Sequence, residues 1–329
     1  MRKEITMNKQ EYLDRLEKGL QIVTESIRSD ILDDIRLHFE QGLSEGRREG
    51  EIIDELGPIE DLLQELGQFP EEKTGEAKEN QKVLPVRQLN IDGLIANVTL
   101  VKSQDDRVNV KMTKGGKLID RALYLLRTTH EQDIFEIRVD RMFDLNSKNT
   151  QIELIVEVPG KVKIIELKHV SGKIRIEELI LDQLVVSTAN GDVFLKKSMI
   201  DRISLNNADG DFHLEEVIVK HLKVNSASGD VHVHGFAESV KINTASGDID
   251  LETPGTKDLN ISTVSGDAQI KTKHENLNMK LNFKTMSGCI MYYEKDVEKV
   301  IEGSGIYEFG QGEASITIST VSGDVKFKK

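Results

Sequence analysis

Residues 222–252 read LKVNSASGDVHVHGFAESVKINTASGDIDLE, and this stretch contains the repeat that decides the fold. Two Ser-Gly-Asp steps, at Gly229 and Gly247, each lie between runs of alternating apolar and polar residues. Alternation with a period of two is typical of strands with one buried face, and Ser, Gly and Asp favour a bend between them. The stretch therefore predicts pairs of strands joined at a glycine.

The same unit recurs through the C-terminal part of the chain. Its turn glycines are Gly172, Gly191, Gly210, Gly229, Gly247, Gly266, Gly288 and Gly323. The successive spacings are 19, 19, 19, 18, 19, 22 and 35 residues, and a fixed period in this range indicates a stacked array. We expect a mainly β protein, a right-handed parallel β-solenoid with coils of about 19 residues. The last interval predicts an inserted excursion at residues 294–313.

Four columns carry the same kind of side chain in every repeat. The positions seven and five residues before each glycine, and two and four after it, are apolar or aromatic, with Ala268 and Tyr292 the weakest members. Stacked coils would bury each column against itself. Seven residues three before the glycine suggest a stacked hydroxyl and amide ladder at the corner: Thr188, Asn207, Ser226, Thr244, Thr263, Thr285 and Thr320.

The N-terminal residues have a helical period instead. Asn8 is a plausible N-cap, and apolar residues then recur at helical spacing, including Ile27, Ile31, Ile35, Phe39 and Leu43. Gly57-Pro58 ends one helix and opens a short last one. We expect three or four amphipathic helices that pack on one another or on a partner. The predicted organisation is a helical domain at 1–67, a charged linker at 68–83 and a solenoid domain at 84–329.

The composition narrows the class of partner and the compartment. A formal net charge of −13 disfavours direct binding to nucleic acid and favours basic partners. Cys289 is the single cysteine, so an intrachain disulfide is impossible. The chain contains no apolar run long enough for a transmembrane segment, and its first residues contain no signal-peptide core. We therefore expect a cytoplasmic protein.

Two sets of polar residues at repeated positions are candidates for metal binding. Six turn glycines are followed by aspartate, with Lys173 and Cys289 as exceptions. A structural role at the turn is favoured over a calcium site, because calcium needs six or more oxygen ligands. His213, His232, His234 and Asp250 lie at outward positions of adjacent repeats and form a candidate zinc patch. The favoured alternative for this patch is a solvated strand face.

Catalytic motifs are missing from the sequence. It contains no Gly-x-Ser-x-Gly elbow, no P-loop and no dinucleotide fingerprint, and Cys289 is interpreted as a tolerated substitution. We expect no catalytic residues, no cofactor and no enzymatic activity. The alternative is a carbohydrate-binding or carbohydrate-active β-helix. That alternative requires aromatic residues on one face, from the candidates Phe194, Tyr292, Tyr293, Tyr307 and Phe309.

Two family resemblances accompany these patterns. The Ser-Gly-Asp repeats over about residues 84–329 resemble a bacterial candidate-adhesin family of β-strand-repeat proteins, found beside cell-envelope stress genes. The segment from MNKQEYLDRLEKGL through EGEIIDELGPIEDLLQEL resembles the HAAS signalling domain. The resemblances imply a non-enzymatic interaction or scaffold protein, with a link to envelope stress signalling. They also imply a regulatory protein partner for the helical domain, such as a PadR-like transcriptional regulator, while self-association of the solenoid is a further expectation.

Overall fold

The computed structural model describes residues 7–22, 25–60, 63, 85–115, 124–141, 151–271, 278–294 and 297–328. The chain divides into two compact units; the helical residues belong to one of them and most of the β region to the other. Each is described by itself. The linker predicted at residues 68–83 lies outside the described residues.

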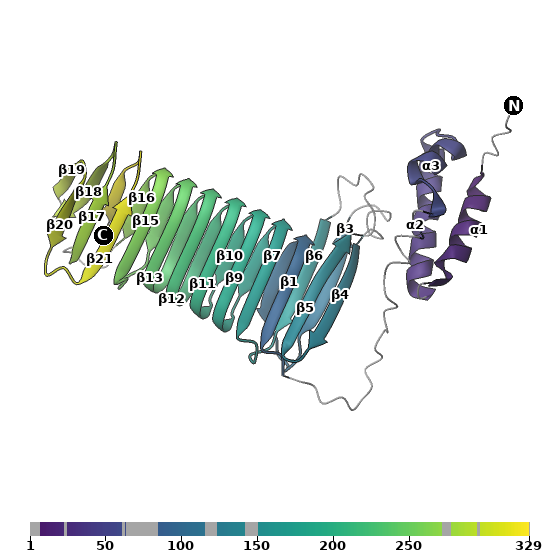
Figure 1. Ribbon diagram of the computed structural model, residues 1–329, viewed down its shortest axis with the longest axis horizontal. Coiled ribbons are helices and arrows are strands. Elements are labelled where there is room, and N and C mark those ends of the chain that lie inside the picture. Colours follow the sequence, from purple (N-terminus) through teal and green to yellow (C-terminus); the bar gives the residue numbers. More distant parts are fainter. Residues whose placement is uncertain are drawn as a thin grey trace. The chain divides into compact units, whose positions relative to one another are not determined.

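Among the described residues of the helical module, three α-helices and a short 3-10 turn have defined bounds (Figure 1). They are α1 (Lys9–Gly19), the turn at Leu20–Ile22, α2 (Glu25–Ser44) and α3 (Glu49–Leu56). The Asn8 side chain accepts a hydrogen bond from the Glu11 amide at 2.9 Å, and the Glu11 carboxylate accepts one from the Asn8 amide. Gly57 has a φ of +76° directly after α3. Both predicted helix boundaries are therefore confirmed, at Asn8 and at Gly57.

The apolar stripes of the three helices pack on one another. Their buried residues form one core: Tyr12, Leu13, Leu16, Leu20, Ile31, Leu32, Ile35, Phe39, Ile52, Leu56 and Ile59. The rings of Tyr12 and Phe39 meet edge to face, with centroids 6.0 Å apart. The α2 stripe leaves this core at its end, where Leu43 is 41% exposed. The stripes were expected to pack either on one another or on a partner. In the described residues they pack on one another.

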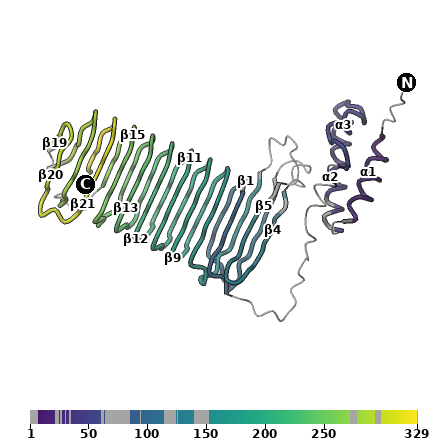
Figure 2. The backbone as a smooth tube through the Cα atoms, in the orientation of Figure 1, coloured from purple at the N-terminus to yellow at the C-terminus, as the bar shows by residue number. Residues whose placement is uncertain are grey.

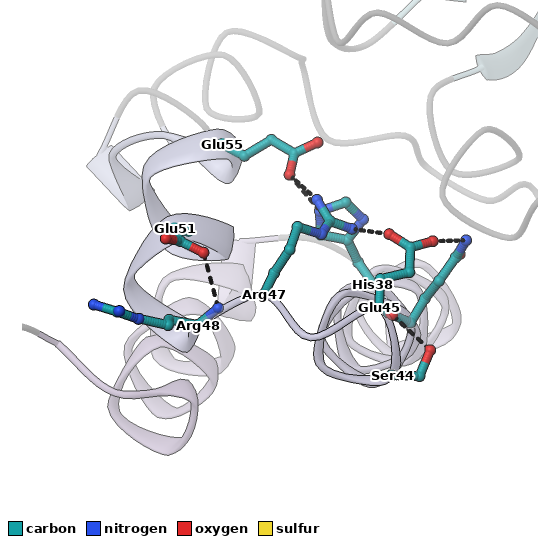
Figure 3. Close-up of polar contacts among 8 residues, drawn as sticks. His38, Ser44, Glu45, Arg47, Arg48, Glu51 and Glu55 are labelled. Atoms are coloured by element: carbon teal, nitrogen blue, oxygen red, sulfur yellow. Dashed lines mark hydrogen bonds and ion pairs between the residues drawn. The ribbon is translucent and has the colours of Figure 1, made fainter.

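A cluster of charged residues fixes the corner between α2 and α3 (Figure 3). The guanidinium group of Arg47 pairs with the carboxylates of Glu45 and Glu55, and Nε2 of His38 lies 3.7 Å from Glu55. The Arg48 amide donates to the Glu51 carboxylate at 3.0 Å, which satisfies one of the free donors at the start of α3. Because Arg47 contacts acidic residues on both sides of the turn, it links the two helices there.

In the described part of the β region, 22 strands belong to one sheet. Figures 1 and 2 show them stacked side by side. They are β1 (Gln88–Ile95), β2 (Asn97–Lys102), β3 (Asn109–Gly115), β4 (Tyr124–Glu131), β5 (Ile134–Arg141), β6 (Gln151–Val158), β7 (Ile164–Ser171), β8 (Ile174–Glu177), β9 (Ile180–Asn190), β10 (Val193–Lys196), β11 (Met199–Asp209), β12 (Phe212–Ser228), β13 (Val231–Ser246), β14 (Ile249–Glu252), β15 (Asp258–Ser265), β16 (Ala268–Lys271), β17 (Met279–Lys284), β18 (Cys289–Glu294), β19 (Val297–Glu302), β20 (Gly305–Phe309), β21 (Ala314–Ser319) and β22 (Val325–Lys328).

The central coils stack in parallel and in the order of the sequence. Val193 of β10 pairs with Phe212 of β12, which pairs in turn with Val231 of β13, so each column contacts itself one repeat further on. All members of the four apolar columns are buried except Tyr292, which is half-buried. The predicted burial of these columns and their parallel stacking are confirmed.

The strands continue around a second corner that the repeat analysis did not identify. There β12 and β13 each join the second strand of one coil to the first strand of the next. Glu178, Lys197 and Glu216 occupy this corner in the left-handed region, with φ values of 58°, 48° and 53°. Val217 pairs directly with Gly235, so the next coil lacks this left-handed residue. That missing residue explains the single spacing of 18.

The turn glycines stack too closely for any side chain. Gly210 has a φ of +124°, and a methyl group built on it would overlap the carbonyl oxygen of Gly191 in the coil below. The same overlap recurs at each turn glycine of the stack. Glycine is therefore required here both by its backbone conformation and by the approach of the neighbouring coil.

The order of the coils changes at the C-terminal end. β21 and β22 pair with β15 and β16 on one side and with β17 and β18 on the other. The coil marked by Gly323 therefore lies between those marked by Gly266 and Gly288, where strictly sequential stacking would place it outermost. The predicted excursion forms β19 and β20, which pair antiparallel with β18 and β17.

The N-terminal end has the mirror-image order. β1 and β2 pair with β7 and β8 on one side and with β5 and β6 on the other. The first coil in the sequence is thus the second in space, and β3, which follows it in the chain, pairs with β6 of the outer coil. In this first coil, Ala96-Asn97 occupies the position of the Gly-Asp step. This follows because a methyl group built on Gly172 would overlap the Ala96 carbonyl, as it would overlap the glycine carbonyl in the other coils.

Candidate functional site

The predicted histidine patch lies on the outward face of the second strands of the central coils. Six residues in register form the histidine column: Arg175, Phe194, His213, His232, Asp250 and Gln269. The next outward position forms the charge column: Glu177, Lys196, Glu215, His234, Glu252 and Lys271. His213, His232, His234 and Asp250 therefore lie together, as the sequence predicted.

Three rings of the histidine column stack on one another. The centroids of Phe194 and His213 are 4.8 Å apart with planes 9° from parallel, and those of His213 and His232 are 5.1 Å apart with planes 6° from parallel. The Arg175 guanidinium carbon lies 5.7 Å from the Phe194 centroid, on this same ladder. Parallel ring planes and a terminal cation were not predictable from residue identity alone.

The charge column is joined by ion pairs between adjacent coils. Lys196 pairs with Glu215 at 2.8 Å, and Lys271 pairs with Glu252 at 2.8 Å. The hydrogen bond between Lys196 and Glu215 raises the pKa of the lysine and lowers the pKa of the glutamate. His234 lies 3.9 Å from Glu252. The exposed pairs of this column contribute little to stability, because such pairs are screened by solvent.

A shallow depression opens between these columns. It is lined by His213, Glu215, His232, His234, Asp250 and Glu252, with Leu214 and Val233 below them. In the part of the chain that the structure describes, no three His, Cys, Asp or Glu side chains are grouped as one metal ion requires. Stacked imidazoles direct their nitrogen lone pairs side by side, whereas tetrahedral zinc needs them to converge. The arrangement therefore lends no support to the zinc hypothesis.

The aspartate column has a structural function at the turns. Oδ1 of each aspartate accepts a hydrogen bond from the backbone amide of the next coil: Asp211 to Asp192, Asp230 to Asp211, Asp248 to Asp230, Asp267 to Asp248 and Asp324 to Asp267, at 2.8–3.3 Å. Asn97 accepts from the Lys173 amide in the same way. Each of these carboxylates therefore bonds a backbone amide of the fold.

Cys289 ends the aspartate column rather than forming a reactive site. Its amide donates to Asp324 at 2.9 Å, and it belongs to the outermost coil of this end. Burial, together with a hydrogen bond to the Asp324 carboxylate, raises the pKa of the Cys289 thiol. A nucleophilic cysteine needs the opposite shift.

The corner hydroxyls bond differently from the ladder that we expected. Ser226, Thr244 and Thr263 each donate to the carbonyl two residues ahead in their own coil. The side-chain ladder between coils lies one residue earlier, where Asn243 donates to Asn225 at 2.9 Å and Asn225 donates to Asn206 at 2.7 Å. A hydroxyl beside a bend reaches its own backbone first, so in these coils the side-chain ladder is formed by the amide column.

His169 occupies the corner column in the first regular coil and is buried. Its Nε2 lies 2.7 Å from the Ala96 carbonyl and its Nδ1 lies 3.1 Å from Thr188 Oγ1. A carbonyl only accepts, so Nε2 carries the proton and Nδ1 accepts from the threonine. Burial lowers the pKa of His169, an effect that the Ala96 hydrogen bond partly opposes.

An apolar column on the outer surface was missed by the sequence analysis. Ile180, Met199, Ile218 and Phe236 pair in register, with exposures of 59%, 49%, 48% and 40%. Phe236 lies beside Gly255 of the next coil, where the column ends. The sequence contains a signal for this column, because its residues lie eight or seven positions after successive turn glycines.

The aromatic residues do not gather on one face. Phe194 belongs to the histidine column of the central coils, whereas Tyr292 and Phe309 meet edge to face at the C-terminal end, with centroids 5.2 Å apart. Tyr307 bonds the Gly303 carbonyl at the same end, and the Tyr293 side chain lies outside the described residues. The described residues therefore provide no aromatic groove for the carbohydrate alternative.

Comparison with known proteins gives two family matches. Residues 86–328 match the Toastrack DUF4097 family, and residues 11–65 match the HAAS family. None of the curated proteins matches the chain. Within the described part of the chain, no helix is long and apolar enough to cross a membrane.

Two solved structures have low similarity to the chain. A candidate cell adhesion protein from Clostridium sporogenes ATCC 15579 has 11% identity and a TM-score of 0.28, covering 74% of this chain and 94% of its own. A candidate adhesin from Bacteroides fragilis NCTC 9343 has 13% identity and a TM-score of 0.38, covering 75% and 94%. At these values neither structure bears on function. The match over residues 86–328, which include every strand of the β region, is the decisive one: the chain belongs to the Toastrack DUF4097 family.

Proposed function

We propose that this protein is a non-enzymatic interaction protein, in which a rigid β-solenoid presents a binding surface to a protein partner. The aspartate column and the lysine and glutamate pairs of the charge column are engaged in hydrogen bonds and ion pairs of the fold itself. The aspartates bond backbone amides, and the lysines and glutamates pair across coils. Such a surface is suited to recognition by shape and charge.

The observation that carries this proposal is the apolar column. Ile180, Met199, Ile218 and Phe236 place four large apolar side chains in a row on one edge of the stack, each at least 40% exposed. Isolated exposed apolar residues are ordinary, but a contiguous row on a rigid scaffold is typical of an interaction site. Charged residues flank it, including the ion pair between Asp201 and Lys220 at 2.8 Å. A protein partner with apolar and charged residues would fit such a surface.

The helical module is proposed to bind a regulatory partner, such as a PadR-like transcriptional regulator. Its match to the HAAS family supports this role. Its apolar stripes are packed inside the module, so the partner would contact the outer faces of the helices, where Leu43 is exposed. A role in cell-envelope stress signalling is part of the same proposal and rests on the family resemblance alone.

The proposed organisation is a helical domain at 1–67, a linker at 68–83 and a solenoid domain at 84–329, in the cytoplasm. Limited proteolysis that cuts first between residues 68 and 83 is expected. Fractionation of the native cell tests the location, and recovery in the cytoplasmic fraction is the expected result.

Affinity capture with the full-length protein tests the apolar column. Met199→Ser combined with Ile218→Ser should lose a partner that the wild type captures, while thermal unfolding stays nearly unchanged because both side chains are exposed. The matched control is Val264→Ser with Val321→Ser, which removes two exposed apolar residues of adjacent coils at another corner. Capture that both double variants retain equally would contradict the proposal.

A further inference from the structure

The two ends of the stacked ladder are unlike each other. At the Phe194 end, the ring is covered by the Arg175 guanidinium at 5.7 Å and approached by the Lys173 ammonium at 5.9 Å. At the other end, the residue in register with His232 is Asp250, whose side chain is too short to cover an imidazole ring. The depression lined by both residues lies at this end.

The carboxylates around this depression differ in their partners. Glu215 is paired with Lys196, and Glu252 is paired with Lys271. Asp250 accepts one hydrogen bond, from Gln269 Nε2 to Oδ1, at a long 3.4 Å. Among the described residues, no lysine or arginine forms an ion pair with Asp250. Asp250 contributes only at longer range to the raised pKa of Lys271. Its carboxylate is therefore the one of the three without a direct cationic partner.

We propose that this depression binds the guanidinium group of an arginine from a basic protein partner, stacked on His232 and bonded to the Asp250 carboxylate. The inference rests on the proposed interaction function and names the chemistry of the partner. Guanidinium is planar, stacks on aromatic rings and presents paired N–H donors that match a carboxylate. The chain itself uses this contact at the opposite end of the same ladder, where Arg175 lies over Phe194. The net charge of −13 favours the approach of such a partner.

Other ligand classes fit the depression less well. An anion would meet three carboxylates within it. An ammonium group has no flat face to place against the His232 ring, although it would satisfy the charge of Asp250. These differences make the comparison of arginine with lysine the informative measurement.

The test uses the full-length protein with ¹³C-labelled histidine, whose eight side chains give a simple spectrum. L-argininamide and L-lysinamide are titrated separately at about 0.15 M salt, where the Debye length is about 8 Å. We expect argininamide to shift the His232 ring signals saturably, and to bind several-fold more tightly than lysinamide. Asp250→Asn should weaken argininamide binding by about tenfold or more, since a charge-assisted bidentate contact is lost.

Matched variants separate this contact from general electrostatics and from folding. Glu238→Gln removes one carboxylate elsewhere on the solenoid and should leave the affinity unchanged. In the His232 variants, the ring signals of His213 and His234, which line the same depression, report binding. His232→Phe keeps a flat ring and should retain binding, whereas His232→Ser should lose it. Equal binding of argininamide and lysinamide, or full affinity in Asp250→Asn, would overturn the inference. If the apolar-column variants still abolish partner capture in that case, the interaction function stands and only the arginine site is wrong.

Discussion

The middle of the stack, between Gly172 and Gly266, differs from its two ends. Both are built from the same kind of strand pair, but the coils stack in a different order relative to the sequence. In the middle, each coil stacks on the one that precedes it in the chain, as β9 on β7 and β11 on β9. At the C-terminal end the last coil, β21 and β22, lies inside the previous one. At the N-terminal end the first coil, β1 and β2, lies inside the next. The middle is thus a simple repeat, while both ends are interlocked.

The interlocking has a physical reason. A parallel stack ends in a strand edge whose unpaired amides and carbonyls would bind another chain. At the C-terminal end, β19 and β20 pair antiparallel with β18 and β17 of the outer coil. The chain then returns to fill the slot between β15 and β17. Strands β17 to β20 form the cap of this end. The cap is connected in the chain both to β16 and to β21, which are inner strands of the stack, so it cannot detach without disturbing an inner coil.

The largest effect is expected from removing residues 314–329. This truncation deletes β21 and β22, the coil that lies between those of β15–β16 and β17–β18. We expect the whole end from β17 to β20 to lose its hydrogen-exchange protection, because its parallel neighbour is gone. The control is the protection of β9 and β11, which should remain. Protection of β17 that survives truncation would mean that it re-pairs directly with β15, as in a stack built in sequence order.

A glycine substitution compares the middle with the cap. Gly210→Ala should destabilise the protein by about 3 kcal/mol, because the added methyl group overlaps the Gly191 carbonyl at a φ of +124°. Gly303, in the cap, has a φ of +78° with no atom within 4 Å of a built Cβ. Gly303→Ala should therefore cost about 1 kcal/mol, from backbone strain alone. Urea denaturation measures both, and equal costs would show that close stacking of the glycines is unimportant.

The regular middle was predictable from the sequence, whereas the order at the ends was not. The columns at Gly288 and Gly323 carry the same residue types as those of the central coils, so their pattern does not distinguish one slot in the stack from another. Ala96-Asn97 forms a turn without glycine, so the glycine spacing alone could not locate the first coil within the solenoid domain predicted from residue 84. The right-handed sense of the solenoid stays a prediction.

For the histidine patch, the sequence predicted which residues are neighbours but not how their side chains interact. A fixed repeat places His213, His232 and Asp250 in one column, and pairing in register confirms that placement. The stacking of the rings and the partnering of each carboxylate depend on side-chain rotamers, which no periodicity specifies. The zinc hypothesis was based on residue types and on their positions in adjacent repeats, and the stacked rings give it no geometric support.

His169 tests the junction between the interlocked N-terminal end and the middle, since it bonds Ala96 on one side and Thr188 on the other. Burial lowers its pKa, so the unfolded chain binds more protons than the folded protein as pH falls through the ordinary value of 6.5. Stability should therefore decrease as pH drops below about 6.5. His169→Thr, which places the residue of the neighbouring coil at this position, should lessen that decrease. Urea midpoints at several pH values measure it, and identical pH profiles would exclude the effect.

The smallest effect is expected in the aspartate column, which runs from the middle into the C-terminal end. Asp230 accepts from the Asp248 amide at 2.8 Å, so Asp230→Ala should cost about 1 kcal/mol, the net value of that hydrogen bond over one to water. Asp230→Asn keeps an acceptor oxygen, as Asn97 does at the other end, and should change stability by less than about 0.5 kcal/mol. If repulsion between stacked carboxylates outweighed their hydrogen bonds, Asp230→Ala would instead stabilise the protein. Because the two variants remove the same charge and differ in the acceptor, their difference in unfolding free energy measures the hydrogen bond itself.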